Sequence, residues 1–339
     1  MLLSIVVISH NKRDLLKRCV DSILAQALPI EYEIIISDDA SADGSWELAQ
    51  EYEKKFRQIR AYRCNSDDCK PANTSHRSGW NRCNAYKYAK GKYMAYVDGD
   101  DYLKEGSNIY FKQVELLEQH PDCSCCMANI WIANEGEPLE RGHLRMRAAN
   151  RFFSTGEILT AEDFIEQSAF VESHAFVYRR NEAVNPVELY GKRYVDEIIT
   201  MHHLQFGSVI CLDDWGYVYM HYTNHLQISS ELGRADDCIV LWNMALYVSQ
   251  LIPYWRKIYY RTHLKEILDV VRIAKSGYRL REDSYNSLQG LGLWIYSAFN
   301  RKLTIIDRAR LDIIIKYVKF LKRNKIRSDC AMNLLFVML

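Results

Sequence analysis

Three carboxylates follow an apolar run in the first third of the chain. Residues 93–97 read Tyr-Met-Ala-Tyr-Val, and Asp98, Asp100 and Asp101 come directly after this run. Ionised groups packed this closely at the end of a buried strand disfavour one another unless a cation neutralises them. Carboxylate oxygens are hard ligands that suit Mg²⁺ or Mn²⁺, and such an ion can hold a phosphate-bearing substrate. The spacing therefore predicts a divalent-metal site and a ligand that carries phosphate.

Polar residues also end two earlier apolar runs. Ser9 and His10 follow the first run, and Asp38 and Asp39 follow the second. In an open parallel sheet, ligands bind beyond the carboxyl ends of the strands. If the strands lie side by side, these residues and the acids at 98–101 line one crevice. The alternative is that short polar residues only cap helices and turns.

The spacing of apolar residues predicts alternating strands and helices over the first hundred residues. This alternation, with short connections, is typical of βαβ units and of a parallel sheet with right-handed crossovers. The continuous apolar runs fit strands that are covered on both faces. We expect strands at residues 3–8, 33–37, 59–63 and 93–97, and helices at 13–26, about 45–56 and 78–90.

The regular alternation of strands and helices ends after residue 105, and from about residue 231 only helical patterns occur. We therefore expect three parts, at residues 1–105, 106–230 and 231–339. The middle part should hold a helix at 109–118, a polar loop at 134–150, and strands at 125–133, 174–179, 208–212 and 215–221. The last part should hold helices at 239–251, 254–274, 285–299 and 307–323.

The composition is that of a soluble globular protein. Of the 339 residues, 48% are apolar and 26% are charged, and the formal net charge of +1 gives no field for nucleic acid. No apolar run is long enough to span a membrane, and the apolar first eight residues are too short for a signal peptide. The ten cysteines show no pair of spaced CxxC motifs. This spacing argues against a zinc site. Without a signal peptide, we expect the cysteines to be reduced thiols in the cytoplasm.

Three segments, in order and at similar spacing, resemble glycosyltransferase family 2. They are residues 4–12, residues 33–44 and residues 89–101, and the last contains Asp98-Gly99-Asp100, which resembles the family's DxD motif. The resemblance is close over the first hundred residues and weaker to about residue 230. It implies an α/β protein of the GT-A type, with an open, mostly parallel, Rossmann-like sheet flanked by helices and a C-terminal helical subdomain. It also implies a nucleotide-diphosphate-sugar donor and inversion at the anomeric carbon.

The resemblance assigns roles to residues at the strand ends. By position, Ser9 and His10 lie by the nucleobase, and Asp39 accepts a hydrogen bond from uracil. Asp98 is the acid nearest the ribose, and Asp100 is a metal ligand.

Two further positions match the family with departures. Arg82 occupies a place where the family often has an arginine facing the nucleotide, but Cys83 replaces the usual asparagine beside it. Arg82 could equally be a solvated helix residue. His225 matches a histidine that follows the last strand, where it contacts the diphosphate or the metal, although Thr223 replaces the usual arginine. The implied ligands of Mn²⁺ or Mg²⁺ are thus Asp100, Asp98 and His225.

Asp196 and Glu197 resemble the family's acidic pair at the start of a helix near the acceptor. Glu197 occupies the position of the general base, but the family more often has aspartate there, so the choice between the two stays open. A base at this place would take the proton of the attacking hydroxyl. The alternative is that the acids only favour a helix N-terminus.

Together these features imply an inverting hexosyltransferase that is metal-dependent. It would move a sugar from a UDP-sugar to a glycan or lipid-linked oligosaccharide in bacterial surface polysaccharide synthesis. One alternative is a scaffold that binds sugar nucleotide without catalysis. Another is a phosphatase, but that chemistry needs its Asp-x-Asp pair on the first strand.

The C-terminal part mixes basic and aromatic residues at 254–261 and 316–327 and ends in an apolar tail at 334–339. Such helices can lie on an anionic membrane surface, here the inner face of the cell membrane. The alternative is a helical subdomain with a solvated basic face and a tail that packs in a groove or a homodimer interface.

Overall fold

The computed structural model describes residues 2–64, 74–144, 152–166, 173–182, 184 and 195–222, together with seven positions between 309 and 323. The chain forms two compact units. One contains Met1–Phe164 and Ala169–His225, and the other contains Ile165–Ser168 and Leu226–Leu339. The predicted limits at 105/106 and 230/231 stay predictions.

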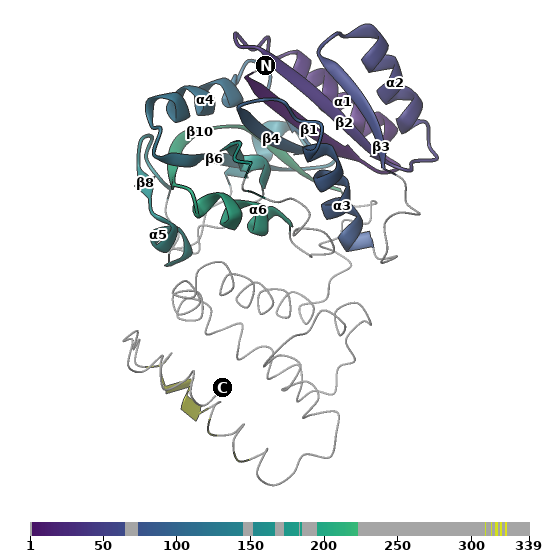
Figure 1. The fold of residues 1–339 in the computed structure, drawn as a ribbon. Coiled ribbons are helices and arrows are strands. Elements are labelled where there is room, and N and C mark those ends of the chain that lie inside the picture. Colours follow the sequence, from purple (N-terminus) through teal and green to yellow (C-terminus); the bar gives the residue numbers. More distant parts are fainter. Residues whose placement is uncertain are drawn as a thin grey trace. The chain divides into compact units, whose positions relative to one another are not determined.

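The first half of the larger unit consists of the predicted βαβ units. Four parallel strands lie in the order β3-β2-β1-β4, with α1 and α2 on one face and α3 on the other (Figure 1). The strands β1, β2 and β4 are buried along almost their whole length, as their continuous apolar runs predict. The bounds are β1 Leu3–Ser9, α1 Arg13–Leu24, β2 Tyr32–Asp39, α2 Ser45–Lys55, β3 Ile59–Cys64, α3 Thr74–Tyr86 and β4 Tyr93–Asp98.

The second half extends the same sheet with strands of both directions. β9 pairs antiparallel with β4 and with β6, and β6 pairs parallel with β10, so β4, β6 and β10 run the same way. The elements are β5 Tyr102–Leu103, α4 Ile109–Gln119, β6 Cys123–Asn134, η2 Leu139–Arg141, β7 His143–Leu144, β8 Ile158–Leu159, α5 Ala161–Glu166, η4 Ser173–Ala175, β9 Phe176–Arg179, α6 Val195–Leu204 and β10 Ser208–His221. The sheet is therefore mostly parallel and flanked by helices, as expected.

Three sequence-based boundaries are wrong. The strands predicted at 208–212 and 215–221 form one strand, β10, whose register shifts between Cys211 and Tyr217. The helix predicted at 78–90 is α3, which begins at Thr74 and ends at Tyr86. It ends early because the backbone N–H groups of residues 87–89 bond three residues back, in tight turns. The predicted loop at 134–150 contains η2 and β7.

In the smaller unit the described residues after residue 226 all lie within the helix predicted at 307–323, and all are helical. The helices predicted at 239–251, 254–274 and 285–299 lie outside the described residues. Within the described part of the chain, no helix combines the length and the apolarity needed to cross a bilayer.

A buried histidine packs α6 against the sheet. His203 is 1% exposed, and its ring stacks on Tyr178 with 4.6 Å between ring centroids. The Tyr178 hydroxyl lies 2.8 Å from Thr200 Oγ1 of the same helix. Burial, aided by the neighbouring His202, lowers the pKa of His203 to about 3.

This burial predicts a loss of stability in mild acid. The folded pKa lies below the unfolded value of about 6.5, so the contribution is present above that pH and is lost as the pH falls towards 3. Each pH unit below about 6.5 should cost about 1.4 kcal/mol of unfolding free energy. Urea denaturation at pH 7.5 and 5.5 should show this loss in the wild type and a smaller one in His203→Gln. His143 is exposed, so His143→Gln is the control. Equal losses of unfolding free energy in the wild type, His203→Gln and His143→Gln would contradict the prediction.

Candidate functional site

The carboxyl ends of the parallel strands meet at one edge of the sheet. In the register, Ser9 lies opposite Asp38, and Ile8 lies opposite Asp98. The polar residues that end the three strands therefore come together, as the sequence predicts. Gly99 then turns the chain, and its N–H donates to the Ile8 carbonyl oxygen at 2.8 Å. A Cβ at residue 99 would lie 2.8 Å from that same oxygen, so the residue between the two acids of the motif must be glycine.

Asp98 forms an ion pair with Arg82 of α3. Arg82 Nη2 donates to Asp98 Oδ1 at 2.6 Å, and the two side chains are 5% and 27% exposed. Burial by itself raises the pKa of Asp98, but Arg82, with His174 and Lys12 further off, lowers that pKa below its usual value. Arg82 is therefore not a solvated helix residue, and it holds Asp98 in its ionised form.

Asp100 has a different partner. Its carboxylate pairs with the ammonium group of Lys12, which lies in the turn between β1 and α1. Its carbonyl oxygen accepts hydrogen bonds from Arg18 Nη2 at 2.8 Å and from the Tyr222 hydroxyl at 2.5 Å. Asp100 is thus fixed at its backbone by α1 and by the end of β10, and its side chain is 16% exposed.

Asp101 points into the protein and joins the turn to β10. Its carboxyl group accepts from the Tyr217 hydroxyl at 2.5 Å and from the Met220 N–H at 2.8 Å, and the residue is 2% exposed. Burial, followed by the negative charges of Asp100 and Asp98, raises the pKa of Asp101 well above its usual range. The third acid of the motif is therefore a structural group that favours its neutral form.

The chain itself neutralises these acids. Arg82 balances Asp98, Lys12 balances Asp100, and burial keeps Asp101 close to neutral. Arg82 and Lys12 thus supply cationic partners for two of these acids, and the divalent ion expected from the sequence stays a prediction.

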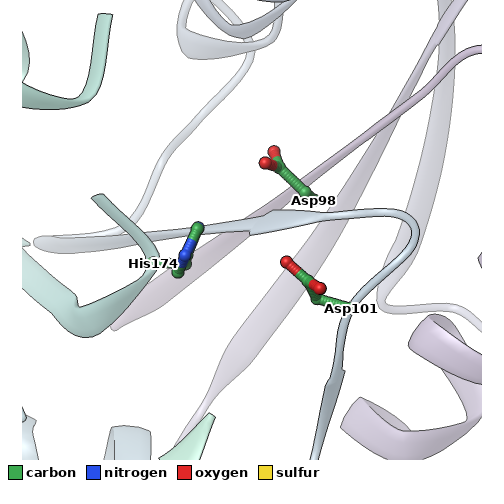
Figure 2. Close-up of side chains that lie close together, drawn as sticks. All are labelled: Asp98, Asp101 and His174. Atoms are coloured by element: carbon green, nitrogen blue, oxygen red, sulfur yellow. The ribbon is translucent and has the colours of Figure 1, made fainter. Parts of the chain in front are cut away.

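A group of metal-ligating side chains nevertheless lies at this edge. One ligand atom each from Asp98, Asp101 and His174 lies within 4.8 Å of the others, and Figure 2 shows the three side chains close together. His174 lies in η4, is 1% exposed and stacks on Tyr217 with 4.1 Å between ring centroids. Carboxylate oxygens fit Mn²⁺ or Mg²⁺, and an imidazole is a frequent further ligand of transition metals. This group differs from the predicted ligands, since Asp100 faces Lys12 and His225 lies outside the described residues.

The residues expected to hold the nucleobase lie at the ends of β1 and β2. Ser9 and Asp39 are buried, and His10 is exposed at the rim. His10 Nδ1 lies 2.6 Å from the Asp39 carbonyl oxygen, and its Nε2 lies 3.1 Å from Asn11 Nδ2. The structure therefore brings Ser9, His10 and Asp39 together.

Sequence reasoning missed Asn81, the neighbour of Arg82 on α3. Its Nδ2 donates to the Ser37 carbonyl oxygen at 2.9 Å and to the Ser9 carbonyl oxygen at 3.5 Å, so one amide joins β1 to β2. It also missed Lys12 and Arg18, the cations beside Asp100. Both follow the first strand within ten residues, but nothing in the sequence shows which acid they would meet.

Asp196 and Glu197 lie in the first turn of α6, as the sequence predicts. Their side chains lie outside what the structure describes, so the choice of base stays a prediction. α6 packs against η4, the segment that carries His174. The backbone thus brings the helix of the acidic pair next to the segment that faces Asp98.

Comparison with known families decides the class of protein. Residues 4–185 match the family model described as Glycosyl transferase family 2. The chain belongs to glycosyl transferase family 2. Its family 2 segment covers β1 to β9, and so includes the strands that carry Ser9, Asp39 and Asp98, but it ends before β10.

Two relatives whose names give an activity are similar in sequence to part or most of this family 2 chain. It is 23% identical over 282 residues to a GalNAc(5)-diNAcBac-PP-undecaprenol beta-1,3-glucosyltransferase of Campylobacter jejuni, covering 76% of this chain and 85% of that one. It is 38% identical over 104 residues to a poly(ribitol-phosphate) beta-glucosyltransferase of Bacillus spizizenii, covering 30% of this chain but only 15% of the relative.

Solved structures confirm the GT-A fold expected of family 2. The chain resembles S. aureus TarS 1-349 in complex with UDP-GlcNAc, with a TM-score of 0.64, 16% identity, and coverage of 96% of this chain and 90% of that one. It also resembles the mannosyltransferase PcManGT of Pyrobaculum calidifontis in complex with GDP-Man and Mn²⁺, with a TM-score of 0.51, 13% identity, and coverage of 88% and 81%.

Proposed function

We propose that this family 2 glycosyltransferase transfers a hexose, with inversion, from a UDP-sugar to a hydroxyl of a glycan or lipid-linked oligosaccharide in bacterial surface polysaccharide synthesis. The observation that carries the proposal is the meeting of Asp98 and Asp100 with Arg82 and Lys12 at the carboxyl edge of the sheet. The UDP-GlcNAc complex of the structural neighbour and the undecaprenol-linked substrate in the relative's name support the donor and acceptor classes.

In this mechanism the strand ends bind the donor. Ser9, His10 and Asp39 hold the nucleobase, and Asp98, kept ionised by Arg82, accepts hydrogen bonds from the ribose. A divalent ion held by Asp98, Asp100 and His225, or by Asp98, Asp101 and His174, would supply a Lewis acid for the charge on the departing diphosphate. Mn²⁺ in the complex of the mannosyltransferase neighbour supports this choice of ion.

The acceptor reacts from the side of α6. Asp196 or Glu197 removes the proton of the acceptor hydroxyl as its oxygen attacks the anomeric carbon opposite the leaving UDP. One glycosidic bond forms as the bond to UDP breaks, so the configuration inverts. We further propose that residues 1–105 bind the donor, residues 106–230 bind the acceptor, and residues 231–339 form the helical region.

A screen of UDP-sugars for donor hydrolysis in the presence of Mn²⁺ tests the function without knowledge of the acceptor. One UDP-sugar should be hydrolysed faster than the others, and UDP with Mn²⁺ should raise the melting temperature because both bind the folded state. Binding of UDP without turnover of any donor would favour the non-catalytic scaffold. Absence of both binding and turnover would contradict the proposal.

We also propose that the chain works in the cytoplasm at the inner face of the membrane, through its C-terminal helix. Ile313 and Phe320 are 54% and 53% exposed, and Lys316, Lys319 and Arg323 are described in the same helix. Basic and apolar side chains on one helix suit an anionic lipid surface. Co-sedimentation with phosphatidylglycerol vesicles should fall at least severalfold when Ile313 and Phe320 are both replaced by Ser. Unchanged sedimentation would contradict membrane contact, and loss of a dimer in the same variant would assign the face to self-association.

A further inference from the structure

Lys12 is the cation that pairs with the side-chain carboxylate of Asp100, the second acid of the motif. The Lys12 ammonium pairs with Asp100 Oδ2, and the two side chains are 27% and 16% exposed. Asp98 pairs with Arg82, and Asp101 bonds to Tyr217 and β10. Lys12 is therefore the group that an ion would have to displace in order to reach the Asp100 carboxylate.

The backbone around Lys12 is held by side chains of residues 41–45. The Lys12 N–H donates to Ser45 Oγ at 3.3 Å, the Asn11 N–H donates to Ser41 Oγ at 2.9 Å, and the Arg13 N–H donates to Asp43 Oδ2 at 2.9 Å. The backbone of Asp100 is held by Arg18 and Tyr222, as described above. Since both backbones are fixed, separating the pair needs only a rotation of the flexible Lys12 side chain.

Charge balance then couples the ion to the nucleotide. Asp98 is paired to Arg82, Asp100 is paired to Lys12, and Arg18 also lies against Asp100, so the two acids already have cationic partners from the chain. A divalent cation alone would add two positive charges beside the existing cations Lys12, Arg18 and Arg82, which disfavour it at short range. A nucleotide diphosphate brings about two negative charges and offers Lys12 a new partner, so the cation and the diphosphate favour each other.

We propose that Lys12 is an internal counter-cation of Asp100 that makes binding of the divalent ion depend on the nucleotide diphosphate. This inference rests on the proposed function. In the absence of nucleotide, Lys12 occupies the Asp100 carboxylate and keeps the affinity for the ion low. When the diphosphate binds, the ammonium group transfers its hydrogen bonds to the phosphate oxygens and the carboxylate becomes available. Because such coupling is reciprocal, the ion strengthens nucleotide binding by the same factor.

Mn²⁺ titration followed by the electron paramagnetic resonance of free Mn²⁺, with and without UDP, tests this directly on the full chain. In the wild type, UDP should strengthen Mn²⁺ binding by about tenfold or more, within the usual range of coupling between sites. Lys12→Met should bind Mn²⁺ alone about tenfold more tightly and should lose most of the UDP effect. Lys12→Arg keeps the charge and should retain the coupling. Lys17→Met removes an exposed lysine that pairs with Asp21 on α1, so it should behave as the wild type.

The outcomes separate this inference from the proposed function. If the wild type binds neither Mn²⁺ nor UDP, the proposed function fails. If the wild type binds both but Lys12→Met shows the same Mn²⁺ affinity and the same UDP effect, the counter-cation role is overturned. A Lys12→Arg variant that loses the coupling would overturn it as well, because the positive charge would then not be the cause. Melting temperatures of all variants show whether each remains folded.

Discussion

Replacing Asp100 with Asn should lower the rate of sugar transfer about 10²–10³-fold, the loss typical when a group that stabilises developing charge is removed. The amide cannot replace a carboxylate as a ligand for a hard cation, so the charge on the departing diphosphate loses its stabilisation. The fold should survive, because Asp100 is fixed through its backbone carbonyl by Arg18 and Tyr222. The rate of donor hydrolysis and the melting-temperature shift given by UDP with Mn²⁺ are the measurements.

Asp101→Asn is the comparison that decides between the two sets of ligands. An Asn carboxamide can accept from the Met220 N–H and donate to the Tyr217 oxygen, so the structural bonds are kept. If Asp100 binds the ion, Asp101→Asn should retain the rate within about threefold, because the isosteric side chain keeps both contacts to β10. If Asp101→Asn is the inactive variant and Asp100→Asn the active one, the ion belongs to Asp98, Asp101 and His174, and the role given to Asp100 is wrong.

Removing the general base should give the second large effect. Either Glu197→Gln or Asp196→Asn should lower the turnover number for transfer by about 10²–10⁴-fold, the usual contribution of a positioned base. The other variant should change it much less. Binding of UDP with Mn²⁺ should be unaffected in both, because the base acts on the acceptor hydroxyl and touches no part of the nucleotide.

The readout separates catalysis from support of the helix. Loss of a favourable acid at a helix N-terminus costs about 0.3–1 kcal/mol of stability and leaves the turnover number unchanged. Exposed Glu47 in the first turn of α2 gives a matched control as Glu47→Gln. If both α6 variants transfer sugar at near the wild-type rate, the base lies elsewhere and the acids only favour the helix.

The sequence predicts the donor half of the fold because its signals are local. Residues 5–8 and 34–36 are continuous apolar runs, and polar residues follow each directly. Parallel strands bring such endings to one edge by geometry alone, so Ser9, Asp39 and Asp98 meet without further information. The order of the elements and the edge of the sheet that holds the site could therefore both be predicted.

The cations that contact Asp100 could not be predicted, because they lie far from it in the sequence. Lys12 and Arg18 lie 88 and 82 residues before Asp100, and nothing in either neighbourhood marks the pairing. The prediction of two strands in place of β10 has a local cause. Asp213 and Asp214 lie between the two predicted strands. Asn129 donates to Asp213 and Lys112 donates to Asp214, and these bonds keep both acids within one bulged strand.

The close approach of Gly99 to β1 has a consequence for engineering the enzyme. Any side chain at that position would push against the Ile8 carbonyl oxygen and wedge apart the two central strands. A library aimed at new donors should therefore leave residue 99 unvaried. Diversity belongs instead at the rim, where exposed His10 can be exchanged without disturbing the strand pairing beneath it.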